Sequence, residues 1–211
     1  MLSAVRRGAR YELMITRRCL PKYDFNVTRC GKVNDRGVDF RGSWTLLGLD
    51  SIPVLGQCKC FQRPIGPVII REFAAVVKRE QRHANDVPYL GVICAAGGFT
   101  ELARREWRDQ DTPLVLMRWP APSFIPTQTK SPLNLDAMQD DLSWVDSIEA
   151  TPCLELQWNP AASHHFHILN QIAVTWSWKS VYNDNNMSGN SIQKSSPILR
   201  RIHSDDTIPY A

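Results

Sequence analysis

Two neighbouring stretches decide the fold: residues 37–46 read GVDFRGSWTL and residues 54–61 read VLGQCKCF. Apolar and polar residues alternate in both, as they do in half-buried β-strands. Successive strand residues point to opposite faces, so Gln57 and Lys59 project together. An antiparallel pairing of the two strands brings Asp39 beside them. We therefore expect a carboxylate, an amide oxygen and an ammonium group to converge on one patch.

Helices and further strands flank this pair in a regular order. The N-terminal region has weak helical periodicity up to Pro21, and the segments after residue 64 switch between helical and continuous apolar patterns. We expect helices at 4–20, 68–82 and 101–109, and further strands at 24–28, 89–95 and 113–119, with a turn at 34–37. A strand, a helix and a second strand in succession imply parallel neighbours in one sheet. The order α-β-β-β-α-β-α-β predicts an α/β fold whose mixed central sheet is flanked by helices.

Length and composition indicate a globular protein. The chain has 211 residues, of which 43% are hydrophobic and 22% charged, and this excludes collagen-like, coiled-coil and fully disordered classes. Its most apolar windows are too short to span a membrane. We expect one main domain at 1–119, a linker with an accessory C-terminal segment at 120–182, and a disordered tail at 183–211.

Charge divides the chain into a basic body and an acidic C-terminal part. Residues 1–119 hold 20 of the 25 Lys and Arg and 12 of the 21 Asp and Glu, whereas residues 120–211 carry a net negative charge. A basic body favours contact with a polyanion such as nucleic acid. A solvated basic surface is the alternative.

The N-terminus and the cysteines bear on the compartment. The first eighteen residues carry five Arg and one acid, a composition compatible with a mitochondrial presequence, although a first core helix is the preferred interpretation. The 6 Cys include no C-x-x-C pair and form no secreted disulfide framework, which favours a reducing compartment. Cys58 and Cys60 are expected to be small core residues.

Hydrolysis of a phosphodiester suits the chemistry expected at the patch. Mg²⁺ prefers oxygen ligands and keeps several waters. Asp39 can bind the cation, the Gln57 amide oxygen and the Cys58 backbone carbonyl can add neutral oxygens, and Lys59 can position a water or steady developing charge. A turn acid at Asp39 and a surface lysine at Lys59 remain the alternatives, because the spacing alone is degenerate.

The ordered phrases GARYE, DRGVDFRGSW, QCKCF, IGPVIIREF and YLGVICAAGGFTELA together resemble the Mrr-type branch of the PD-(D/E)xK nuclease superfamily over residues 8–119. More narrowly, they resemble the fungal family of required for respiratory growth protein 7, a mitochondrial family with a restriction-endonuclease-like core. The resemblance implies Glu12 as the helix acid, Asp39 as the metal-binding acid, Gln57 in place of a commoner acid, and Lys59 as the catalytic lysine.

The same resemblance implies a metal-dependent DNA endonuclease that uses Mg²⁺ or Mn²⁺, acts in the mitochondrion and is needed for respiratory growth. The alternative is a non-catalytic nucleic-acid-binding or assembly factor that keeps the nuclease fold. A homodimer is left open.

Weaker signals lie outside the patch. Thr100 in GGFT can cap a helix or help to hold a phosphate, and Arg71 and Lys78 can contact a DNA backbone or form a solvated helix face. Three histidines and a cysteine of the C-terminal part could imitate a metal cluster and support a metabolic enzyme; they are His164, His165, His167 and Cys153. Core packing is the preferred role of the three tryptophans Trp44, Trp107 and Trp119, against stacking on bases.

Overall fold

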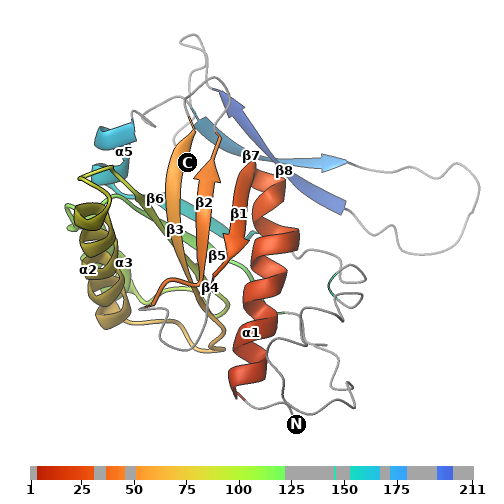
Figure 1. Ribbon diagram of the computed structural model, residues 1–211. Helices are drawn as coiled ribbons and strands as arrows, with labels where there is room; N and C mark the ends of the chain where they lie inside the picture. Colours follow the sequence, from red (N-terminus) through yellow and green to blue (C-terminus); the bar gives the residue numbers. More distant parts are fainter. Residues whose placement is uncertain are drawn as a thin grey trace, which may run out of the picture.

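The computed structural model describes residues 4–30, 37–45, 51–121, 145, 153–166, 172–179 and 194–201. It has the expected α/β architecture: a six-stranded mixed sheet with helices on both faces, and a separate two-stranded sheet (Figure 1). The helices are α1 (Ala4–Met14, continued by a π-helix at Ile15–Cys19 and a 3₁₀-helix at Leu20–Tyr23), α2 (Pro67–His83), α3 (Glu101–Arg108) and α5 (Pro160–Phe166). The strands of the large sheet are β1 (Phe25–Arg29), β2 (Phe40–Trp44), β3 (Ile52–Lys59), β4 (Leu90–Ala95), β5 (Leu114–Arg118) and β6 (Glu155–Trp158). The small sheet pairs β7 (Ile172–Lys179) with β8 (Lys194–Arg201).

The large sheet follows chain order from β1 to β6. β1, β2 and β3 form an antiparallel meander, β3, β4 and β5 are parallel, and β6 returns antiparallel to β5. The expected order of elements is therefore confirmed from α1 to β5. The C-terminal end of β3 lies beside the start of β2. The two stretches GVDFRGSWTL and VLGQCKCF therefore meet at this end of the sheet.

Two apolar layers cover the sheet. α1 and its continuation pack on one face, with Tyr11, Met14 and Ile15 buried there. The Tyr11 hydroxyl donates to the Trp119 carbonyl oxygen at 2.8 Å, which ties α1 to the end of β5. α2 and α3 pack on the other face around Phe73 and their buried neighbours. The N-terminal stretch thus forms the core helix that its periodicity favours.

The sheet extends beyond the boundary expected at residue 119. β6 and α5 come from the segment expected to be accessory, and the Asn159 side chain between them is fully buried. Its Oδ1 accepts from the backbone amides of Leu114 and Ala162, both at 3.0 Å. Its Nδ2 donates to three carbonyl oxygens, those of Trp107, Gln110 and Thr112. The buried side-chain amide of Asn159 therefore links β6 and α5 to the connection between α3 and β5.

Other parts of the sequence interpretation meet the structure only in part. Lys194–Arg201 forms β8 within residues 183–211, and the disorder expected for the rest of that tail stays a prediction. Residues 34–36 of the turn expected at 34–37, and His167, lie outside the described residues. Among the described residues, no helix is both long and apolar enough to cross a bilayer.

Candidate functional site

Asp39 lies immediately before β2, at the point where β2 begins to pair with β3. Its backbone amide donates to the Gly56 carbonyl oxygen at 2.8 Å, which continues the ladder by one bond. Its side-chain Oδ2 accepts from the Cys58 backbone amide at 2.6 Å. The carboxylate therefore takes the position that a further β2 carbonyl would occupy, and it is fixed against β3. Asp39 thus approaches the Gln57–Lys59 stretch, as predicted, through the backbone amide of Cys58.

The Cys58 carbonyl oxygen faces the same side of β3. Backbone groups of a strand alternate between its two neighbours, and the Lys59 carbonyl oxygen accepts from Ala96 on the β4 side. Cys58 must then direct both its N–H and its C=O toward β2. The Cys58 carbonyl therefore faces the side of β3 from which Asp39 approaches.

Glu12 reaches this edge from α1, on one face of the sheet. Its Oε2 accepts from Arg29 Nε at 2.8 Å, and the two side chains are 17% and 29% exposed. Arg29 is the last residue of β1 and lies opposite Phe40 in the β1–β2 register. This ion pair was not anticipated, because no local pattern joins a helix residue to a strand seventeen positions later.

The carboxylates of Asp39 and Glu12 both affect the pKa of the Cys58 thiol. Burial raises its pKa well above the usual range, and Cys94, Asp39 and Glu12 raise it further. The two acids therefore act on one sulfur atom although they arrive from different elements.

Gln57 and Lys59 point to the opposite face from Cys58, as strand alternation requires. Gln57 is buried, and its Nε2 donates to the Gly37 carbonyl oxygen at 3.0 Å. Gly37 has a φ of +85°, so Gln57 braces a turn that favours glycine. Lys59 is half-buried at the end of β3. Gln57 and Lys59 therefore lie on the face of β3 opposite Cys58, and the Cys58 amide holds Asp39 at the end of this strand. The assembly of all four residues into one site stays a prediction.

The donors at this edge suit a hard cation. Asp39 offers a carboxylate, Cys58 a carbonyl oxygen, and Glu12 a second carboxylate once its pairing with Arg29 is relaxed. Within the described parts of the chain, no group of three His, Cys, Asp or Glu side chains is placed to hold a metal. A site of two carboxylates and one carbonyl fits Mg²⁺, which binds through few protein ligands and keeps waters.

The residues predicted for DNA contact have other partners. Arg71 pairs with Glu106 at 2.8 Å and Lys78 with Asp111 at 2.6 Å, so both link α2 to α3 or to the turn after it. The Thr100 hydroxyl accepts from the Ala103 amide at 3.1 Å and caps α3. The capping alternative for Thr100 is therefore present in the structure, and a role in DNA contact stays a prediction for all three.

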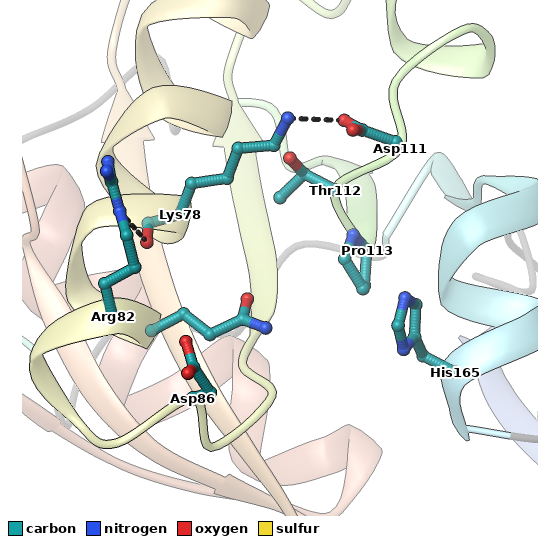
Figure 2. A pocket seen from close by; sticks show the side chains of 8 residues that line it. Lys78, Arg82, Asp86, Asp111, Thr112, Pro113 and His165 are labelled. Carbon is teal, nitrogen blue, oxygen red and sulfur yellow. Dashed lines mark hydrogen bonds and ion pairs between the residues drawn. The ribbon is translucent and has the colours of Figure 1, made fainter.

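A pocket of about 390 Å³ lies at the other end of the parallel strands, away from Asp39. Figure 2 shows Lys78 and Asp111 joined above it, with Pro113 and His165 along one side. Cations and acids are mixed in its lining, so it offers no single charge to a polyanion. It is separate from the candidate site.

The C-terminal histidines do not form the metal cluster considered from sequence, within the residues that can be placed. His164 and His165 lie on α5 with their rings 5.8 Å apart, and the buried Cys153 thiol donates to the Glu155 carbonyl oxygen at 2.9 Å. Trp44, Trp107 and Trp119 are all buried, which confirms their core role.

Comparisons with known proteins identify the family. Residues 10–120 match the family model of the restriction endonuclease (Mrr catalytic) domain, from within α1 to the end of β5. An uncharacterized mitochondrial protein of Schizosaccharomyces pombe is 26% identical over 118 residues, or 55% of this chain and 45% of that protein. The chain thus matches less than half of that relative's length. No solved structure matches.

Proposed function

The chain belongs to the restriction endonuclease family with an Mrr-type catalytic domain, and from this premise we propose that it is a metal-dependent endonuclease that cleaves phosphodiester bonds in DNA. The observation that carries the proposal is the 2.6 Å hydrogen bond from the Cys58 amide to Asp39 Oδ2. This bond holds a carboxylate beside a backbone carbonyl, where a cation and a phosphate can meet.

Each residue of the edge has a distinct role in this proposal. Asp39, Glu12 and the Cys58 carbonyl would hold Mg²⁺ or Mn²⁺. The bound cation would neutralise the phosphate and favour ionisation of a water. Lys59 follows Cys58 directly and would orient the attacking water and steady the charge that develops on the phosphate. Gln57 fixes the Gly37 turn and so positions Asp39, two residues later.

Contact with DNA would be mainly to its backbone. The net positive charge of residues 1–119 supports this. Backbone contacts make binding strongly dependent on salt. Arg71 and Lys78 would contribute only where their ion pairs with Glu106 and Asp111 open.

We also propose a mitochondrial location and a role in respiratory growth. The location is supported by the Schizosaccharomyces pombe relative, which is named as a mitochondrial protein. The role follows from the resemblance to the family of required for respiratory growth protein 7, carried by DRGVDFRGSW and QCKCF.

A second function, a DNA-binding or assembly factor without catalysis, is favoured by one observation. Gln57 is neutral and already donates to Gly37, and Glu12 is already paired with Arg29. Such a site has less negative charge for a cation than three free carboxylates would have.

The test is cleavage of supercoiled and linear DNA by the purified chain in Mg²⁺ or Mn²⁺, with EDTA as a blank. Asp39→Asn and Lys59→Met should each abolish cleavage, whereas Arg82→Met, in the separate pocket at the end of α2, should retain it. A filter-binding or anisotropy assay on the same variants measures affinity for DNA. Binding without cleavage, unchanged in Asp39→Asn and Lys59→Met, would establish the second function instead.

A further inference from the structure

The Glu12–Arg29 pair lies inside the candidate site and is held from both sides. Glu12 is in the last turn of α1, which the Tyr11–Trp119 hydrogen bond anchors. Arg29 ends β1, and the next residue, Cys30, donates its amide to the Asp39 carbonyl oxygen at 2.9 Å. The backbone segments that carry both side chains are therefore anchored, and the Arg29 segment is tied to Asp39 through Cys30.

We infer that Arg29 is a positioning residue that competes with the divalent cation for Glu12 and thereby sets the cation affinity of the site. The inference rests on the proposed function, since it requires a cation to bind at Asp39 and Glu12. Arg29 holds Glu12 Oε2 toward β1, and a cation can use that oxygen only when the guanidinium gives it up.

Charge makes this competition unavoidable. The Arg29 guanidinium and a divalent cation both carry positive charge, so they compete for the same Glu12 oxygen. A cation at Glu12 would also be repelled by the guanidinium at close range. The pair is mostly buried, at 17% and 29% exposed, so salt screens this repulsion less than it would at an open surface.

The chain supplies a matched control in Arg41. Its Nη2 lies 2.7 Å from Glu80 Oε2, and its side chain is 44% exposed. It is in β2, beside β1, but it lies opposite Leu55 and pairs with α2 on the other face of the sheet. Replacing Arg41 removes the same charge and a similar ion pair without touching Glu12.

The experiment measures Mn²⁺ affinity of the full chain without DNA, by electron paramagnetic resonance of free Mn²⁺ and by calorimetry. Arg29→Met should bind Mn²⁺ about tenfold more tightly than the unaltered chain, equivalent to about 1.4 kcal/mol. Arg41→Met should stay within about twofold. In a Glu12→Gln background, Arg29→Met should change the affinity by less than about twofold, because the contested oxygen no longer carries charge.

Unchanged or weaker binding by Arg29→Met would overturn the inference, and so would an equal gain in the Glu12→Gln background. Arg29→Gln serves as a second variant should Arg29→Met not fold, as judged by circular dichroism. If the unaltered chain binds Mn²⁺ no better than Asp39→Asn does, the proposed metal site fails and the inference fails with it. If that comparison shows binding at Asp39 but the Arg29 variants have no effect, only the inference fails.

Discussion

Replacing Asn159 with alanine should destabilise the whole domain, although Asn159 lies outside the matched catalytic region. The side chain is fully buried and makes five hydrogen bonds. Asn159→Ala leaves the buried amides of Leu114 and Ala162 without their acceptor, at about 1–3 kcal/mol each. We expect a loss of about 4 kcal/mol in the free energy of unfolding, since the three carbonyl oxygens also lose a donor.

Urea unfolding, followed by tryptophan fluorescence and far-ultraviolet circular dichroism, measures this loss. Gln157→Ala is the control, because Gln157 lies in the same edge strand and is exposed; it should change the free energy by less than about 0.5 kcal/mol. A loss below about 1 kcal/mol for Asn159→Ala would refute the reasoning. It would mean that β6 and α5 are not fastened to the α3–β5 connection in solution.

Two further predictions concern titration. Hydrogen bonding from Arg41 lowers the pKa of Glu80 below its ordinary value of 4.5, so its contribution to stability is present above about pH 4.5 and is lost as the pH falls through the lowered value. Glu80→Gln should therefore lower the free energy of unfolding by about 0.5–1 kcal/mol at pH 7. Thermal melts should show that the difference between the variant and the unaltered chain shrinks toward pH 3. A difference that stays constant with pH would contradict the lowered pKa of Glu80. At pH 8 an aromatic disulfide reagent should react first with the half-buried Cys30 and Cys60. Mass spectrometry should find the four buried thiols unmodified until the protein unfolds. The buried thiols are those of Cys19, Cys58, Cys94 and Cys153. Burial raises the pKa of Cys153 to about 12, so early labelling there would show that the core opens.

The elements were predictable from sequence where one pattern dominates. Alternation gave β2 and β3, and α2 differs from its expected range by one residue at each end. β6 could not be delimited from sequence, because its four residues carry no periodicity. Its place depends on the buried Asn159, which also bonds to residues more than forty positions away.

The site was predictable in its residue types but not in its arrangement. Strand alternation placed Gln57 and Lys59 on one face, yet it could not say that Glu12 approaches from the other face. Arg29 as the partner of Glu12, and Gly37 as the partner of Gln57, are tertiary contacts between segments that the sequence leaves independent.

The most direct test of the account is a crystal of the full chain soaked in Mn²⁺ and measured at a wavelength where manganese scatters anomalously. The account predicts an anomalous peak at metal–oxygen distance from both the Asp39 carboxylate and the Cys58 carbonyl oxygen, and no such peak in Asp39→Asn. A peak only elsewhere, for instance between Asp86 and Asp111 in the distant pocket, or no peak at all, would contradict a cation site at the open edge of β3.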